Sequence, residues 1–150
     1  VTVNIGTIEG GRAANLVADM AGARLDLRIP AGLSVASLER HVEAALSKTP
    51  DVTHTVRRRY DPTWTDPNAE IVRLTAANAA AVLGTPPVLT MRVGASDSRL
   101  YRLAGIPSIV CGLTPHNMGG ADEYIQIDEL DAVAAIHTLT AFDFLTTPPP

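Results

Sequence analysis

Hydrophobic and polar positions alternate at the start of the chain, a pattern typical of strands in a sheet with one wet face. Residues 1–8 alternate in this way, a Gly-rich turn follows at 9–12, and a second extended run covers 15–29. Pro30 and Gly32 end that run, because proline cannot donate to a strand ladder. Val1 opens directly into the first strand, so we expect the chain to begin within a domain.

A helix is predicted next, from an N-cap at Ser34 to about Leu46, because an apolar stripe there faces a charged one. Residues 52–59 alternate again and are predicted to form a third strand. Strand, strand, helix and strand make an α+β layer, an antiparallel sheet with helices on one face. So small a sheet leaves apolar surface uncovered. It is therefore predicted to be incomplete, with a further strand and helix upstream.

The Pro-rich segment 60–67 has the chemistry of a connection between domains. Asp66 and Pro67 are predicted to open a helix that ends at Gly84. Helical and apolar extended runs then alternate, which indicates an α/β segment. The remaining expected strands are 88–93, 108–111 and 124–127, and the remaining expected helices are 96–104 and one from Asp128 onward. Residues 148–150 are expected to form a tail.

Composition excludes several kinds of partner. The net charge is −4, and residues 1–60 carry eight Lys or Arg against six acids while 61–150 carry four against ten. Neither half has the basic excess that nucleic acid requires. No apolar run approaches the ~18 to 20 residues of a membrane span, so we expect no membrane partner. The single Cys111 excludes an internal disulfide framework and indicates a cytoplasmic protein.

Two segments are candidate sites in the second half. Around Gly94, Ser96 and Asp97 a strand passes through a glycine into a helix, and ligands favour such strand ends. The alternative is that Ser96 or Asp97 only caps the helix. In the loop 112–123, His116 lies near Asp122 and Glu123. These could ligate a metal, but their spacing matches no compact motif, and a solvated loop is the alternative.

A third candidate lies in the first half, where Arg28 and Asn15 fall on the second extended run. Arginine forms bidentate pairs with carboxylates. A cross-strand pair with an acid is equally consistent with the pattern. Cys111, within an apolar run, is predicted to be a small buried hydrophobe.

Five segments together resemble one family. The stretches 6–19 and 23–30, followed by Val-Gly-Ala-Ser-Asp-Ser-Arg at 93–99, Ala-Gly-Ile-Pro at 104–107 and Asp-Glu-Tyr-Ile at 122–125, resemble the zinc metallopeptidases. That family includes aminoacylase, glutamate carboxypeptidase, acetylornithine deacetylase and succinyl-diaminopimelate desuccinylase. The resemblance implies that residues 1–59 are a lid and dimerisation domain lacking its first strand and helix. Residues 60–147 are then the carboxy-terminal part of the catalytic domain.

The same resemblance implies a homodimer formed through the lid and hydrolysis of amide bonds in N-acyl amino acids or small peptides. It implies two zinc ions, whose principal ligands and general base lie upstream, so this chain alone is predicted to be inactive. The implied substrate-binding residues are Asn15, Arg28, Gly94, Ser96, Asp97 and Arg99.

One metal ligand is implied in this half, at the position held by Gly119. Glycine offers no donor, and the nearest imidazole is that of His116, which could reach a metal only through a shift in the loop. That departure leaves open a non-catalytic module that self-associates and binds a carboxylate ligand. Exchange of elements between two copies, completing the sheet, is a further alternative.

Overall fold

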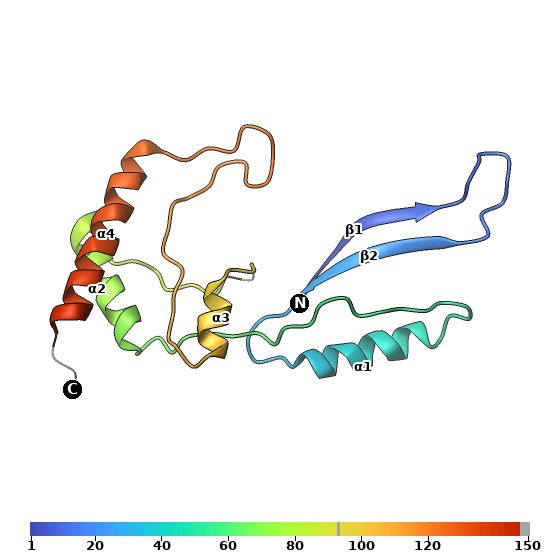
Figure 1. The fold of residues 1–150 in the computed structure, drawn as a ribbon, viewed down its shortest axis with the longest axis horizontal. Helices are drawn as coiled ribbons and strands as arrows, with labels where there is room; N and C mark the ends of the chain where they lie inside the picture. Colours follow the sequence, from blue (N-terminus) through green and yellow to red (C-terminus); the bar gives the residue numbers. More distant parts are fainter. Residues whose placement is uncertain (93, 148–150) are drawn as a thin grey trace. The chain divides into compact units, whose positions relative to one another are not determined.

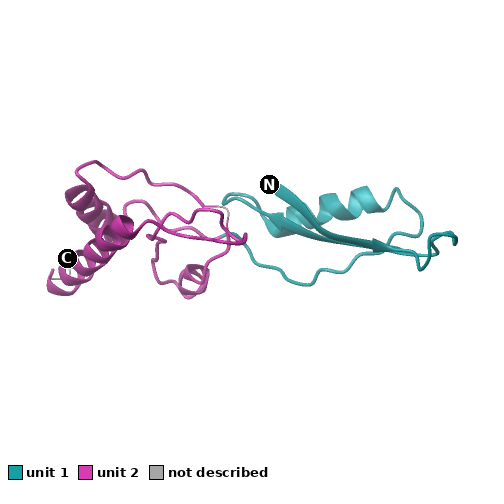
Figure 2. Ribbon diagram, turned by 90° about the horizontal axis from the view of Figure 1, so that it is seen from above, with its two compact units in different colours: residues 1–62 teal, residues 63–150 magenta. Residues whose placement is uncertain are grey.

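The computed structural model describes residues 1–92 and 94–147, and the chain divides into two compact units, residues 1–62 and 63–150 (Figure 2). The first unit contains β1 (Thr2–Gly10), β2 (Ala21–Arg28) and α1 (Val35–Leu46). The second contains α2 (Glu70–Leu83), α3 (Ser98–Leu103) and α4 (Ile127–Thr146), labelled in Figure 1. None of the described helices is long and apolar enough to cross a membrane.

β1 and β2 form a two-stranded antiparallel sheet whose two faces differ in polarity. A register shift at Gly6, between Ile5 and Thr7, keeps the apolar side chains on one face. That face consists of the cross-strand pairs Val3 with Leu27, Ile5 with Leu25, and Ile8 with Ala23. The polar face carries Thr2, Asn4, Thr7, Arg24, Asp26 and Arg28. Ile8 is 74% exposed, so the apolar face is open.

α1 begins where the sequence predicts, because the Ser34 Oγ accepts a hydrogen bond from the Ser37 backbone N–H at 3.1 Å. In the described part of unit 1, however, α1 does not pack on the hairpin. The predicted strand 52–59 is wrong: this segment joins no ladder. Its contact with α1 includes an ion pair between Arg59 and Glu39 at 3.2 Å. The α+β character holds, but the sheet has two strands rather than three.

In unit 2, α2 packs against α4. The buried core of this pair is small and consists of Val72, Thr75, Ala79, Ile136 and Thr140. Asn78 adds a side-chain hydrogen bond to Asp143 at 2.8 Å. Gly84, with φ of 72°, ends α2 as predicted. α2 starts later than expected because the Asp66 carboxylate first accepts the Asn68 N–H, at 2.8 Å, in a preceding turn.

The strands predicted at 88–93, 108–111 and 124–127 are wrong for the described residues of unit 2, which contain no strand. Val93 itself lies outside the described residues. An isolated bridge between His116 and Tyr124 is the one ladder-type pairing described there. A helix satisfies its backbone hydrogen bonds within its own segment, whereas a strand needs a neighbouring strand to satisfy them. These apolar runs have no such neighbour in the described part of the chain.

Candidate functional site

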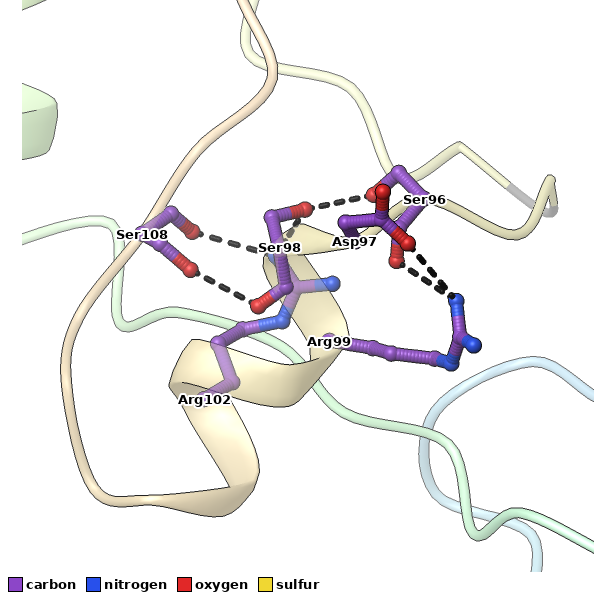
Figure 3. A network of polar contacts seen from close by, with 6 residues as sticks. All are labelled: Ser96, Asp97, Ser98, Arg99, Arg102 and Ser108. Carbon is purple, nitrogen blue, oxygen red and sulfur yellow. Dashed lines mark hydrogen bonds and ion pairs between the residues drawn. The ribbon is translucent and has the colours of Figure 1, made fainter.

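Polar side chains gather around the start of α3 (Figure 3). The Ser96 and Ser98 hydroxyl oxygens lie 2.5 Å apart. The Arg99 guanidinium donates to the Ser96 carbonyl at 3.0 Å and lies 3.7 Å from the Asp97 carboxylate. Ser96, Asp97 and Arg99 therefore lie side by side in the structure, and their role in substrate binding stays a prediction. Gly94 is exposed, beside the Arg92 side chain.

The side chains of Asp97 and Arg99 differ in how far they are exposed to solvent. The Asp97 side chain is 90% exposed and that of Arg99 28%. Asp97 stands at the N-cap position of α3, but its carboxylate accepts no backbone N–H of that helix. The alternative that it serves as a capping side chain is therefore not supported. A half-buried guanidinium is a donor group suited to a carboxylate.

Arg102 ties this cluster to the rest of unit 2. Its Nε donates to the Thr63 Oγ1 at 3.0 Å, and its Nη1 donates to the Ser98 Oγ at 3.2 Å and the Ser108 carbonyl at 3.1 Å. The Thr65 hydroxyl donates to the same carbonyl at 2.6 Å. We call Thr63, Thr65, Ser98, Arg102 and Ser108 the Arg102 clasp. Sequence reasoning missed it, because its partners lie up to 43 residues apart along the chain.

Arg28 and Asn15 do not meet within unit 1. Arg28 ends β2 opposite Thr2, and its Nε lies 2.5 Å from an Asp26 carboxylate oxygen. Asn15 lies in the loop beyond the other end of the hairpin. The eight residues of β2 span roughly 26 Å at ~3.3 Å per residue. One unit therefore cannot place both side chains on one small carboxylate.

The loop that contains His116 is held by its own contacts. The His116 and Tyr124 rings stack with centroids 4.7 Å apart, and the two backbones exchange hydrogen bonds of 2.9 and 3.2 Å. The Asn117 side chain donates to the Ala121 carbonyl. The Gly119 N–H donates to a Glu123 carboxylate oxygen at 3.1 Å. The loop thus has defined structure rather than being a solvated connection alone.

These residues do not fit a zinc site. Residues 1–92 and 94–147 hold no group of three or more His, Cys, Asp or Glu side chains that could share a metal ion. At the implied ligand position, Gly119 supplies only a backbone N–H, which the Glu123 carboxylate accepts. The His116 ring lies against Tyr124. That His116 ligates a metal stays a prediction.

A shallow groove of about 400 Å³ lies between α2, α4 and the segment 107–111. It is lined mainly by apolar side chains, among them Ile71, Ile109 and Phe144. Cys111, also in the lining, is half-buried, and this burial raises the pKa of its thiol above the ordinary value. The His137 Nε2 donates to the Cys111 carbonyl at 2.9 Å. A neutral, mostly protonated thiol at this place matches a packing role.

Comparison with known proteins finds two likenesses. A family described as a peptidase dimerisation domain, of the M20 type, matches residues 1–54. A succinyl-diaminopimelate desuccinylase from Methylobacterium sp. (strain 4-46) is 35% identical over 155 residues, covering 94% of this chain and 37% of the relative. The chain thus spans 37% of the length of the curated relative that it matches. No solved structure shows a significant match.

Proposed function

We propose that this chain, which belongs to the M20 peptidase family, is the self-associating and substrate-holding part of a metal-dependent amidohydrolase. The substrates proposed are N-acyl amino acids or small peptides, cleaved at an amide bond. The observation that carries this proposal is the extent of the sequence similarity to the desuccinylase, which covers 94% of the chain. The similarity therefore includes both units rather than the dimerisation segment alone.

Substrate holding is assigned to the cluster before α3. Arg99 supplies a guanidinium that can pair with a carboxylate, and the Ser96 backbone carbonyl accepts one of its N–H groups. Such contacts orient a substrate but break no bond. Arg28, already paired with Asp26, is proposed as a second carboxylate contact. The metal ions and the general base are assigned to polypeptide outside this chain, because the described residues do not fit a zinc site.

Self-association is assigned to unit 1. A two-stranded hairpin is marginally stable alone in water, and the apolar face of this one is open, with Val3 60% and Ile5 56% exposed. Both strands also have an unpaired outer edge in the described two-stranded sheet, and such edges pair readily with another chain. A homodimer formed through residues 1–54 would cover this surface.

The proposal is tested by incubating the chain with zinc or cobalt and a panel of N-acyl amino acids, N-succinyl amino acids included. We expect binding but no release of amine. Arg99→Met is expected to weaken binding at least about tenfold, because a charge-assisted pair is lost. Arg73→Met is the matched control, since Arg73 is exposed on α2 with one hydrogen bond to a backbone carbonyl. Substantial turnover by the chain alone would refute the assignment of the catalytic groups to other polypeptide.

A second candidate is a non-catalytic module that self-associates and binds a carboxylate ligand. It is favoured by Gly119 at the implied ligand position and by the absence of a three-donor group among the described residues. Mass and metal content discriminate the two candidates. A zinc-free dimer that binds carboxylates through Arg28, in a parent chain that also lacks metal, supports the module. Zinc in the parent chain supports the hydrolase.

A further inference from the structure

Two hydroxyl groups connect the Arg102 clasp with Ser96, one of the proposed substrate contacts (Figure 3). The Arg102 Nη1 donates a hydrogen bond to the Ser98 Oγ at 3.2 Å. The Ser98 Oγ in turn lies 2.5 Å from the Ser96 Oγ. Ser98 therefore belongs both to the clasp and to the cluster before α3.

The direction of donation along these groups follows from the charged end. An arginine side chain carries donors and no acceptor, so the Ser98 Oγ accepts from Arg102. The positive guanidinium also repels the Ser98 hydroxyl proton, which turns away from it. Among the described residues, the Ser96 Oγ is the acceptor that lies within hydrogen-bond distance of that proton. Ser98 therefore donates to Ser96, and the proton of the Ser96 hydroxyl is left for another acceptor.

The clasp fixes Ser98 in the position that this direction requires. The Ser108 Oγ donates to the Ser98 backbone carbonyl at 2.9 Å. Arg102 also donates to the Thr63 Oγ1 at 3.0 Å and to the Ser108 carbonyl at 3.1 Å. A planar guanidinium bound at three acceptors has little freedom to turn away from Ser98. Ser96, Ser98 and Arg102 are each half-buried, so water competes only in part for these bonds.

Ser96 is held at two points. Its backbone carbonyl accepts a hydrogen bond from the Arg99 Nη1 at 3.0 Å, and its hydroxyl accepts one from Ser98. A carboxylate carries acceptors and no donor, so a hydroxyl that can only donate outward suits a carboxylate better than a donor group. Hydrogen bonds joined in a row also polarise one another, which strengthens the last of them.

Resting on the proposed function, we propose that Ser98 and Arg102 are positioning residues of the substrate site. They direct the hydroxyl proton of Ser96 toward a carboxylate oxygen of the substrate. Neither residue touches the substrate itself. Their effect on binding therefore depends on the presence of the Ser96 hydroxyl.

The experiment measures the dissociation constant of N-acetylalanine for the full chain by titration calorimetry. Ser96→Ala is expected to weaken binding about tenfold, because one hydrogen bond to a carboxylate is lost. Ser98→Ala is expected to weaken it about fivefold, because the Ser96 hydroxyl loses its direction. The double variant is expected to bind no more weakly than Ser96→Ala, since Ser98 acts through Ser96. Two independent contacts would instead give a loss of about fiftyfold.

Ser98→Ala keeps the Arg102 bonds to Thr63 and Ser108, so unit 2 is expected to remain folded. Ser47→Ala is the matched control, because Ser47 is exposed in unit 1 with one bond from its hydroxyl to a local carbonyl at 3.1 Å. It is expected to leave the dissociation constant unchanged. Arg102→Lys is expected to bind more tightly than Arg102→Met, because it keeps a charged donor for Ser98.

Each result bears on one of the two proposals. Multiplied losses in the Ser96 and Ser98 double variant would overturn this inference. If Arg99→Met still weakens binding in that case, the proposed substrate site stands without it. Absence of N-acetylalanine binding by the wild-type chain would refute the substrate site and this inference together.

Discussion

Replacing Arg102 with methionine removes the three hydrogen bonds at the centre of the Arg102 clasp, at 3.0, 3.2 and 3.1 Å. A hydrogen bond to a charged group contributes about 1.5–3 kcal/mol, but the side chain is only half-buried, so water compensates part of each loss. The Ser108 carbonyl also keeps its bond from Thr65. We therefore expect a loss of about 2 kcal/mol in the free energy of unfolding, roughly a 30-fold change in the equilibrium.

Urea denaturation of the wild-type and Arg102→Met chains measures this loss, and hydrogen exchange at α3 reports where the structure loosens. The Arg102→Lys chain is expected to have a stability between those of the wild-type and Arg102→Met chains. A lysine keeps the charge but cannot reach three acceptors with fixed geometry. Arg73→Met, which removes one exposed 3.3 Å bond, is the control and is expected to change stability by less than about 0.5 kcal/mol. If Arg102→Met is as mild as this control, the clasp does not hold unit 2 together.

Three further predictions concern single positions. Ser34→Ala removes the N-cap of α1 and is expected to cost about 1 kcal/mol in helix stability, measured by circular dichroism during urea titration; no loss would contradict the observed cap. A Cβ added at Gly119 meets no atom within 4 Å, but the backbone φ of 75° there is unfavourable for a residue with a side chain. For Gly119→His we therefore expect a loss of about 1 kcal/mol in the free energy of unfolding, and no zinc binding in calorimetry. Gly119→Asn is expected to cost less, and tight zinc binding by the histidine variant would show that one ligand completes a site. Because burial raises the pKa of Cys111, less thiolate is present near pH 8 than for a free cysteine. Iodoacetamide is therefore expected to react more slowly with the folded chain than with the urea-unfolded chain, and equal rates would refute the burial.

The elements predicted correctly are those whose signals are local. Ser34 caps α1 through a residue three positions away, and Gly84 ends α2 through its own backbone conformation. The hairpin follows from alternation on two neighbouring strands, although the register shift at Gly6 has no clear sequence signal. Caps, helix-ending glycines and strand alternation each depend on residues a few positions apart, which is the range over which sequence patterns are informative.

The elements predicted wrongly depend on distant partners. Segments 52–59, 88–92 and 108–111 have the composition of strands, but composition cannot supply the neighbouring strand that a ladder needs. The same limit applies to the site. Ser96, Asp97 and Arg99 could be grouped from the sequence because they are close in the chain, whereas the clasp joins Arg102 to a partner 39 residues away. The uncovered sheet expected from the sequence is observed in unit 1 as an open apolar face.

The central claim, that this chain holds substrate for an amidohydrolase but lacks the catalytic groups, is tested most directly by following amine release from N-acyl amino acids. The chain is assayed alone with zinc, and again after assembly with the remaining part of the desuccinylase. We predict no release by the chain alone and release by the assembled pair, reduced by Arg99→Met. Release by the chain alone, or a metal-loaded pair that binds these substrates and cleaves none, would contradict the claim.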